Sequence, residues 1–389
     1  MKNLLVVVRS ISFGVGVGGM ERAATQHIYE MHSKGYQILL IAPKNKISGD
    51  IPDFIKFLDV PWPIWDKYKI LMTMGVAYYR WCQSVADKIN ASQNEIDIIH
   101  FHGASAGTLS FMPETLRKNK VTVVNPHGME EFGTGSLLRL INRSFTRNLL
   151  KKSKFADVVI ATDTILIENV KTNLNIDVDK ICVIPNTIDV VKLKSLAKRS
   201  SNIDEYRIVS VGRMEYNKGY DLLASVLESI KRKGILPNEI SWNHYGNGKM
   251  KDEIIKYSKK NNINLCVHVG ASDKDVQSAI ANSGVFVQPS RYEGSSLTTL
   301  EAMAHSALIV AMPVGGIPDK IFNFKTGFLS KEVTTEQLEL SLCAALTCIK
   351  KNEIKHNAQS YVLEHFDINI STKKYDKLYN DIYSSKRNL

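Results

Sequence analysis

The feature that most constrains the fold is an alternation that runs along almost all 389 residues. Short apolar runs rich in Val and Ile alternate with longer stretches of helical periodicity, and turn or polar residues separate them. Such runs are typical of buried parallel strands joined by crossover helices. The expected strands are Leu4–Val8, Ile38–Ala42, Ile96–Phe101, Val121–Asn125, Val158–Ala161, Cys182–Pro185, Ile208–Val211, Ile240–Tyr245, Cys266–Val269, Val285–Gln288 and Ile309–Ala311. This pattern predicts an α/β fold with two doubly wound parallel sheets.

A polar stretch, Lys192–Asp204, divides the expected strands into two sets. We therefore expect an N-terminal domain over residues 1–190 and a C-terminal domain over residues 191–365. The remaining residues, 366–389, contain no strand pattern. Their apolar residues are spaced as in an amphipathic helix, so we expect this tail to pack against another part of the chain.

Charge and cysteine content restrict the environment and the partners. Lys and Arg number 50 against 39 Asp and Glu, a net charge of +11 that favours anionic partners. The five cysteines form no Cys-x-x-Cys pair, as expected of reduced thiols. The first residues do not fit a signal peptide, because the apolar run Leu4–Val8 is short and Arg9 follows it closely. With no 18-residue apolar stretch, we expect a cytoplasmic protein that can lie at a membrane surface.

The most specific group of polar residues follows the expected strand Val285–Gln288. A loop carries Glu293 and Gly294, and a helix is expected to begin near Ser295. The free backbone N–H groups at such a helix start, from Gly294 through Ser295, Ser296 and Leu297, favour a phosphate. Glu301 follows about two helical turns later, roughly 9 Å along the axis. Two carboxylates at this spacing could flank the diphosphate of a nucleotide-sugar. The alternative is that Glu293 is an ordinary acidic residue of a loop and Glu301 an ordinary charge on a helix surface.

A second group follows the expected strand Ile208–Val211. Arg213 and Lys218 lie in the loop that leads to the next helix. Loops at the carboxyl edge of a parallel sheet line the crevice in which ligands bind. A guanidinium fork and an ammonium point charge suit two phosphates. A solvated basic loop is the alternative when these residues are considered alone.

These motifs together resemble family 4 glycosyltransferases of the GT-B fold. The resemblance is carried in the C-terminal half by Gly212-Arg213, Lys218-Gly219, Gly246-x-Gly248, His268-Val-Gly270, and Glu293 with Glu301-Ala-Met-Ala. In the N-terminal half it is carried more loosely by Gly18-Gly19-Met-Glu21, His100-Phe-His102-Gly103, Pro126-His127-Gly128 and Pro185-Asn186-Thr-Ile-Asp189. It implies two Rossmann-like domains facing a cleft, with the C-terminal helix crossing back to the first domain.

The resemblance also implies an activity and residue roles. The family transfers a sugar from a nucleotide-sugar with retention of anomeric configuration and without a metal or other cofactor. Arg213 and Lys218 would neutralise the leaving diphosphate, Glu293 would contact the donor sugar, and Glu301 the ribose. This chain departs from the usual pattern at Ser295-Ser296, where the family has glycine or bulkier residues, and at Thr187-Ile188, where it has Gly-Val.

Two further features of the first half bear on the same site. The loop Gly14–Gly19 follows a strand and opens a helix, as in dinucleotide-binding folds. NAD is not expected, because Ala42-Pro43-Lys44 stands where that site needs an acid. The resemblance instead places Gly18 and Gly19 beside the donor phosphates. It also gives His127, at the end of a strand, an active-site role in stabilising charge, although a lone histidine is more often structural.

Residues that could suggest a metal site are assigned structural roles. His100 and His102 share one strand face but have no obvious third ligand nearby. Asp177-Val-Asp179 lies in a polar turn, and Asp273-Lys-Asp275 is expected to begin a helix capped by Ser272. We therefore expect no bound metal.

The segment 136–154 contains six basic residues and no acidic one. Arg139, Arg143, Arg147 and Lys151 recur every four residues and form one stripe, and an apolar stripe runs beside it. Such a helix either packs on the core or meets an anionic membrane surface. Nucleic acid is not expected, because no aromatic platform or nucleic-acid-binding module accompanies the charge.

The resemblance, together with the basic segment 136–154, implies a retaining glycosyltransferase that moves a hexose-type sugar from a UDP- or GDP-sugar to a saccharide or lipid-linked saccharide acceptor in bacterial polysaccharide or glycolipid synthesis. Two alternatives remain. One is a nucleotide-sugar 2-epimerase of the same fold, which needs no acceptor. The other is a degenerate, non-catalytic subunit of this fold that binds a nucleotide or a partner enzyme.

Overall fold

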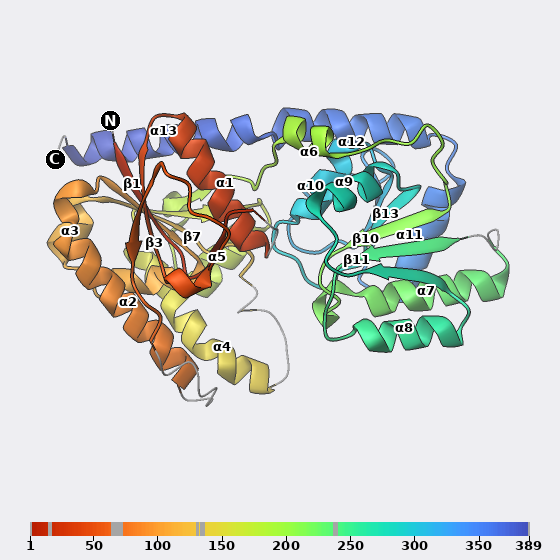
Figure 1. The fold of residues 1–389 in the computed structure, drawn as a ribbon, viewed down its shortest axis with the longest axis horizontal. Helices are drawn as coiled ribbons and strands as arrows, with labels where there is room; N and C mark the ends of the chain where they lie inside the picture. The colour runs from red at the N-terminus through yellow and green to blue at the C-terminus, as the bar shows by residue number, and fades with distance from the viewer. Residues whose placement is uncertain are drawn as a thin grey trace. The chain divides into compact units, whose positions relative to one another are not determined.

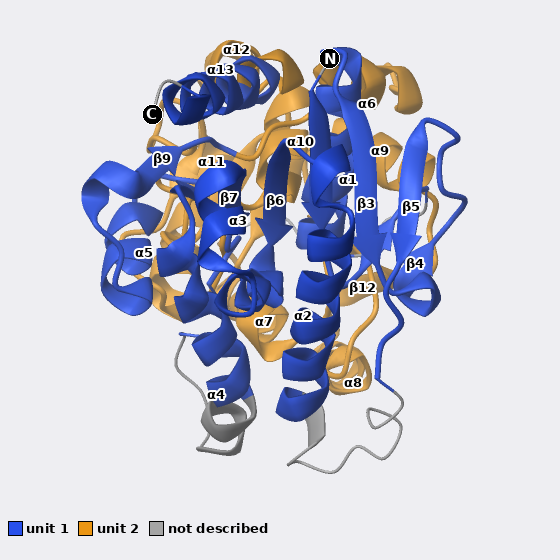
Figure 2. Ribbon diagram, turned by 90° about the vertical axis from the view of Figure 1, so that its left-hand side faces the viewer, with its two compact units in different colours: residues 1–185, 371–389 blue, residues 186–370 orange. Residues whose placement is uncertain are grey.

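The computed structural model describes residues 2–14, 18–63, 73–129, 132, 137–235 and 240–387. The chain divides into two compact units, unit 1 with residues 1–185 and 371–389 and unit 2 with residues 186–370 (Figures 1 and 2). Each unit has a parallel sheet covered by helices, which confirms the predicted α/β class with two sheets.

The sheet of unit 1 has seven strands in the order β5-β3-β1-β6-β7-β8-β9, all of them parallel. Their bounds are β1 Asn3–Val7, β3 Gln37–Ala42, β5 Ile55–Asp59, β6 Ile98–His102, β7 Val121–Asn125, β8 Val158–Ala161 and β9 Ile181–Val183. A small second sheet pairs β2 (Ile11–Ser12) with β4 (Ile47–Ser48). The chain adds strands on one side of β1 and then, from β6 onward, on the other, so a topological switch point lies between β1 and β6.

Side chains alternate across the unit 1 sheet and build a core on each face. On β1, Leu5 and Val7 join the core that contains Trp81 of helix α2 (Thr73–Ala91). Leu4 and Val6 point to the opposite face, where Ile28 of helix α1 (Gly19–Ser33) packs. The other helical segments among the described residues of this unit are α3 Glu114–Asn119, α4 Leu137–Leu150, α5 Leu166–Leu174, η1 Lys44–Lys46, η3 Gln93–Glu95, η4 Gly103–Ser110, η6 Lys151–Phe155 and η7 Val178–Lys180.

The tail forms one long helix, α13 (Ile368–Arg387), and its residues from Ser371 onward belong to unit 1. Tyr375 and Tyr379 are buried in the same core as α1. The helix thus returns to the first domain, as the family resemblance implied.

Unit 2 has a six-stranded parallel sheet in the order β12-β11-β10-β13-β14-β15. The strands are β10 Arg207–Val211, β11 Ser241–Tyr245, β12 Asn264–His268, β13 Val285–Gln288, β14 Ile309–Ala311 and β15 Phe328–Leu329. Counted within the unit, the order is 3-2-1-4-5-6, which is the Rossmann order. Its switch point lies between β10 and β13, so the loops after these two strands define the crevice where a ligand is expected.

Helices cover both faces of this second sheet. One face packs on α7 (Tyr220–Lys233), α8 (Lys251–Lys260) and α11 (Thr335–Thr347). The other packs on α6 (Val190–Leu196), α9 (Asp273–Ala281), α10 (Leu297–Ala304) and α12 (Lys351–His365). Each sheet is therefore a rigid platform for the loops at its carboxyl edge.

Candidate functional site

The loops after β10 and β13 are pressed together at the switch point of unit 2. Gly219 ends the first loop with a φ of 69°, and a Cβ at this position would lie 1.9 Å from the carbonyl oxygen of Pro289 in the second loop. Arg291 reinforces the contact, because its guanidinium donates two hydrogen bonds of 2.7 and 2.6 Å to the carboxylate of Asp221 and stacks over the Tyr216 ring. The two loops thus form a single surface.

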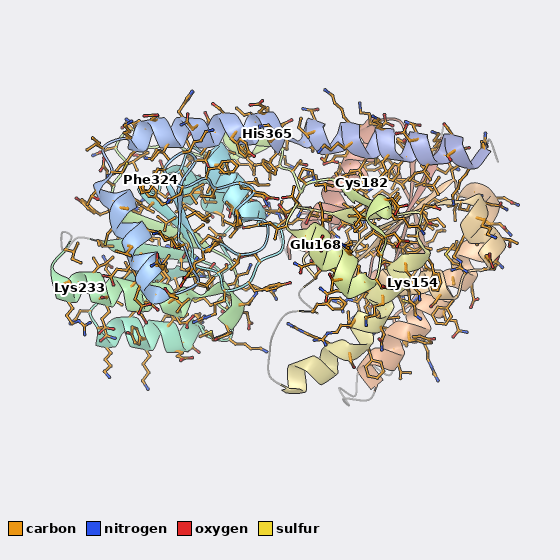
Figure 3. The ribbon with its side chains drawn as sticks, turned by 180° about the vertical axis from the view of Figure 1, so that it is seen from behind. Lys154, Glu168, Cys182, Lys233, Phe324 and His365 are labelled. Atoms are coloured by element: carbon orange, nitrogen blue, oxygen red, sulfur yellow. The ribbon has the colours of Figure 1, made fainter. Side chains whose placement is uncertain are left out.

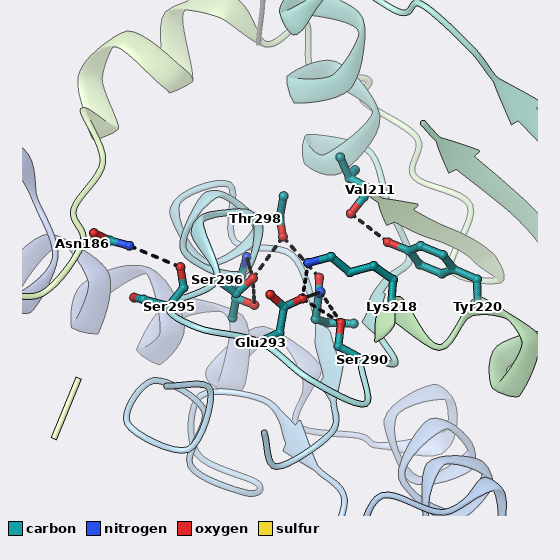
Figure 4. Close-up of polar contacts among 11 residues, drawn as sticks. Asn186, Val211, Lys218, Tyr220, Ser290, Glu293, Ser295, Ser296 and Thr298 are labelled. Atoms are coloured by element: carbon teal, nitrogen blue, oxygen red, sulfur yellow. Dashed lines mark hydrogen bonds and ion pairs between the residues drawn. The ribbon is translucent and has the colours of Figure 1, made fainter. Parts of the chain in front are cut away.

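Glu293 and Lys218 meet on this surface. The Lys218 Nζ donates to Glu293 Oε1 at 2.7 Å, and Gln288 Nε2 and Ser290 Oγ donate to the same oxygen at 2.7 Å (Figure 4). The Glu293 side chain is 7% exposed and that of Lys218 is 18% exposed. Three donors therefore fix the carboxylate. Because an ammonium has three N–H groups, Lys218 can donate to a ligand as well.

The turn that begins α10 is held from two sides. Ser296 caps the helix, accepting hydrogen bonds from the Thr299 amide at 3.3 Å and from the Thr299 hydroxyl at 3.0 Å. Gly316 donates its amide to the carbonyl of Gly294 at 2.8 Å, and a Cβ on Gly315 would lie 2.1 Å from the carbonyl oxygen of Glu293. The backbone from Gly294 to Leu297 is thereby fixed at the carboxyl edge of the sheet.

Lys320 lies fully buried beneath this turn. Its Nζ donates to the Gly316 carbonyl at 2.9 Å and to Ser295 Oγ at 3.2 Å, and it lies 5.6 Å from the centroid of the Phe366 ring. Sequence reasoning missed this residue, because a lysine in a turn-rich segment is usually an exposed charge. No local pattern marks it.

Glu301 is 1% exposed, so the alternative of a surface helix charge is wrong. Its Oε2 accepts a hydrogen bond of 3.0 Å from Gln277 Nε2, and Gln277 Oε1 lies 2.8 Å from His305 Nε2. Burial lowers the pKa of His305 to about 4, so this imidazole is neutral near pH 7. A neutral histidine then donates to Gln277, whose amide in turn donates to the carboxylate.

Arg213 belongs to the same loop as Lys218, but its side chain is exposed. The loop after β11 packs against the backbone on both sides of Arg213. A Cβ on Gly246 would lie 2.0 Å from the Gly212 carbonyl oxygen, and one on Gly248 would lie 2.4 Å from the Met214 carbonyl oxygen. The glycines of the Gly246-x-Gly248 turn thus allow a close backbone contact. Among the predicted residues of unit 2, the structure joins Lys218 with Glu293 directly, and the Arg213 side chain is exposed in the same loop as Lys218.

In unit 1, His127 follows β7 with a φ of 60°, an uncommon backbone conformation for a residue with a side chain. Asn125 Oδ1 accepts a hydrogen bond of 2.9 Å from the His127 amide, and His127 Nε2 lies 3.0 Å from His102 Nδ1. Desolvation lowers the pKa of His127 to about 4. At neutral pH it is therefore an uncharged imidazole held at the carboxyl edge of the sheet.

The predicted pair His100 and His102 belongs to a larger buried network. Tyr379 OH lies 2.5 Å from His100 Nδ1 and 2.9 Å from His27 Nε2. Within the described parts of the chain, no group of three or more His, Cys, Asp or Glu side chains is arranged to hold a metal ion. Ser272 and Asp275 form a capping box at the start of α9, as predicted for the second Asp-x-Asp segment.

Gly18 is the N-cap of α1, and Gly19 is the first residue of that helix. A Cβ on Gly18 would lie 2.6 Å from Glu21 Oε2, whereas one on Gly19 would meet no atom within 4 Å. Gly16 of the same predicted loop lies outside the described residues. Residues 137–154 of the basic segment form α4 and η6, whereas Ser136 and the side chain of Arg139 lie outside the described part of the structure. The described part of the chain contains no helix long and apolar enough to span a bilayer.

Comparison with known proteins identifies the family. The model of Glycosyltransferase Family 4 matches residues 17–192, and the model of Glycosyl transferases group 1 matches residues 192–361. The chain belongs to the family 4 glycosyltransferases. The predicted family is therefore confirmed, and the two matches meet in the polar segment that separates the two sets of strands.

Similar proteins share this family 4 architecture at low sequence identity. A glycogen synthase from Mannheimia succiniciproducens is 24% identical over 217 residues, which cover 50% of this chain and 45% of the relative. The chain thus spans less than half the length of that curated relative. A sucrose-phosphate synthase from Thermosynechococcus elongatus aligns over 99% of this chain and 100% of its own, with a TM-score of 0.76 and 16% identity. Anabaena HepE in complex with UDP aligns over 98% and 100%, with a TM-score of 0.72 and 16% identity. These structures show that the chain has the GT-B fold.

Proposed function

We propose that this protein is a retaining glycosyltransferase that moves a hexose-type sugar from a UDP- or GDP-sugar to a saccharide or lipid-linked saccharide acceptor. The observation that carries the proposal is the fixed Lys218–Glu293 pair at the switch point of unit 2. Family membership supports it, and so does the similarity to HepE, which has been solved with UDP and with UDP-glucose.

Different residues of the candidate site bind different parts of the nucleotide-sugar. Lys218 and the exposed Arg213 supply positive charge for a diphosphate, and the backbone amides from Gly294 to Leu297 supply further donors. Glu293 presents its second carboxylate oxygen to sugar hydroxyls, while Glu301 is assigned to the ribose.

The same groups stabilise the transition state. As the bond from the anomeric carbon to the diphosphate breaks, negative charge grows on the leaving oxygen, and preorganised cations there lower the barrier. The acceptor hydroxyl attacks the anomeric carbon from the same face from which the diphosphate departs, and its proton passes to the departing phosphate oxygen. We assign Gly18 and Gly19 to the approach of the phosphates, and His127 to a hydrogen bond with the transferred sugar.

We expect no metal requirement, because the cationic side chains take the part that a divalent ion has in other glycosyltransferases. Titration of the protein with UDP and with GDP in EDTA tests this directly. Saturable binding of one nucleotide supports the proposal and fixes the base. Binding that appears only after Mg²⁺ or Mn²⁺ is added contradicts it.

The site residues are tested by substitution. Glu293→Ala, Lys218→Ala and Arg213→Ala should each lower turnover of the donor that binds by at least about 100-fold, the effect of losing one electrostatic contact. Exposed basic residues elsewhere in unit 2 serve as controls, and Arg232→Ala and Lys256→Ala should retain activity. Full activity in any of the three site variants would remove that residue from the site.

The assay also separates the alternatives. Conversion of a nucleotide-sugar without any acceptor would point to a 2-epimerase. Tight nucleotide binding with no turnover of any donor would point to a non-catalytic subunit. We place the reaction in the cytoplasm, at the inner face of the membrane, with the basic segment 136–154 toward anionic lipids in polysaccharide or glycolipid assembly.

A further inference from the structure

A groove lies between helices α2, α4 and α5 of unit 1, and none of the residues assigned to sugar transfer lines it. Its volume is about 690 Å³, within the range of roughly 300–1,000 Å³ that is usual for small-molecule sites. The described lining residues are Gly75, Val76, Tyr79, Phe145, Asn148, Leu149, Lys151, Lys152, Lys154, Leu174 and Asn175.

One part of this lining is apolar and exposed. Val76, Tyr79 and Phe145 have exposed fractions of 44%, 48% and 41%, although large apolar side chains are usually buried. Gly75 allows this arrangement, because a Cβ there would lie 2.0 Å from the Phe145 ring. The ring of Phe145 therefore lies directly on the backbone of α2, and the two helices leave an open apolar wall.

The other part of the lining is basic. Lys151, Lys152 and Lys154 all belong to η6, directly after α4, and Lys154 is labelled in Figure 3. The described lining contains no Asp or Glu. A ligand that complements this groove has an apolar body and an anionic group at one end.

We propose that the groove binds a single anionic phospholipid, with the acyl chains against Val76, Tyr79 and Phe145 and the phosphate among the three lysines. A phospholipid contacts both the lysines and the apolar wall. A nucleic acid or a free phosphate would contact the lysines but would make no apolar contact with Val76, Tyr79 and Phe145. The inference rests on the proposed membrane contact of segment 136–154 and is independent of the sugar-transfer chemistry.

The first test uses vesicles of phosphatidylcholine with and without phosphatidylglycerol. Substituting Lys151, Lys152 and Lys154 by Gln should lower partitioning onto phosphatidylglycerol vesicles by roughly 100-fold, at about fivefold per lysine near an anionic surface. The matched control replaces Lys256, Lys259 and Lys260, three exposed lysines of α8, and should change partitioning much less. Equal losses in the two triple variants would show that only net charge matters and would overturn the site.

The second test examines the apolar wall with dioctanoyl phosphatidylglycerol below its micelle concentration. Val76→Glu should abolish saturable one-to-one binding, whereas Val191→Glu, at an apolar position of α6 that is 78% exposed, should leave it intact. Asn148→Trp fills the groove from an exposed position and should act like Val76→Glu, and melting curves check that each variant folds. Binding of inorganic phosphate with the same affinity as the lipid would overturn the proposal.

Two further outcomes are decisive. All groove variants should transfer sugar to a water-soluble acceptor at the rate of the unmodified protein, which separates this inference from the proposed function. An acidic amphipathic peptide that binds with the same dependence on Val76, in the absence of lipid binding, would assign the groove to a protein partner and refute the lipid site.

Discussion

At the scale of single residues, Lys320 links the turn that begins α10 to the turn that follows β14. Its ammonium group is buried and donates to Ser295 Oγ and to the Gly316 carbonyl. A buried acceptor that loses its partner costs about 1–3 kcal/mol. The residue therefore fixes the turn that precedes α10 without facing the ligand itself.

We predict that Lys320→Met lowers the free energy of unfolding by about 1–3 kcal/mol and weakens nucleotide binding. The side chain keeps nearly the same length but cannot donate to either oxygen. Lys325→Met, at an exposed position of the same segment, should change stability by less than about 0.5 kcal/mol. Urea unfolding and calorimetric titration with the nucleotide measure the two effects. Nucleotide affinity that is unchanged in a destabilised Lys320→Met protein would show a purely structural role.

The sequence predicts residues of the site only where a local pattern marks their position. Lys218 and Glu293 could be predicted as site residues because each follows a recognisable strand in a loop with glycine. The structure places Lys218 Nζ 2.7 Å from Glu293 Oε1. Arg291 and Gln277 could not be chosen, since their importance depends on partners 70 and 24 positions away in the chain. Such contacts arise only when the sheet order brings distant loops together.

At the scale of secondary-structure elements, burial decides what could be predicted. Strand β1 is buried along most of its length and appears in the sequence as an unbroken apolar run. Strand β5, with the sequence Ile-Lys-Phe-Leu-Asp, is an edge strand with a mixed burial pattern and was missed. The two-residue strands β2, β4 and β15 are too short to give any periodic signal.

Helix α13 docks on unit 1 through a buried network of imidazole and phenol groups. Tyr379 bridges His27 of α1 and His100 of β6, and His102 pairs with His127 after β7. Burial lowers the pKa of His27 to about 3, and the pKa values of His100 and His102 lie well below their ordinary range. In the unfolded chain, the imidazoles of these histidines take up a proton below about pH 6.5.

We therefore predict that unit 1 loses stability as the pH falls below about 6.5. The unfolded state then binds more protons than the folded one, and each neutral buried histidine lowers stability by about 1.4 kcal/mol per pH unit. The loss continues until the pH reaches the folded pKa values. Urea unfolding at pH 7.5, 6.5 and 5.5 measures this slope. His27→Gln should make the slope shallower than the exposed control His32→Gln does; identical slopes in both variants would argue against a neutral His27.

At the scale of the whole molecule, the two units have separate cores and separate strand orders, so a ligand need not affect them equally. A ligand that binds only the folded state stabilises it by about 2.7 kcal/mol at 100 times its dissociation constant. The proposed donor contacts lie mostly in unit 2.

We predict that UDP or GDP slows amide hydrogen exchange more in unit 2 than in unit 1. The largest effects should fall on β10, β13 and the start of α10, whose loops form the candidate site. Hydrogen-exchange mass spectrometry with and without the nucleotide measures this difference. Protection confined to unit 1 would show that the nucleotide binds to unit 1 and would contradict the assignment of the donor site to unit 2.

The return of α13 to unit 1 also determines the order in which the two units can complete their folding during translation. Unit 2 is one continuous stretch of chain, whereas unit 1 needs Tyr375 and Tyr379 to complete its core. Translation adds roughly 5–20 residues per second, so the first part of unit 1 waits roughly 10–40 seconds while residues 186–370 are made, before its last helix follows. During that interval the nascent chain exposes an apolar surface around His27 and Ile28, which makes this face of unit 1 a natural place for a chaperone to act.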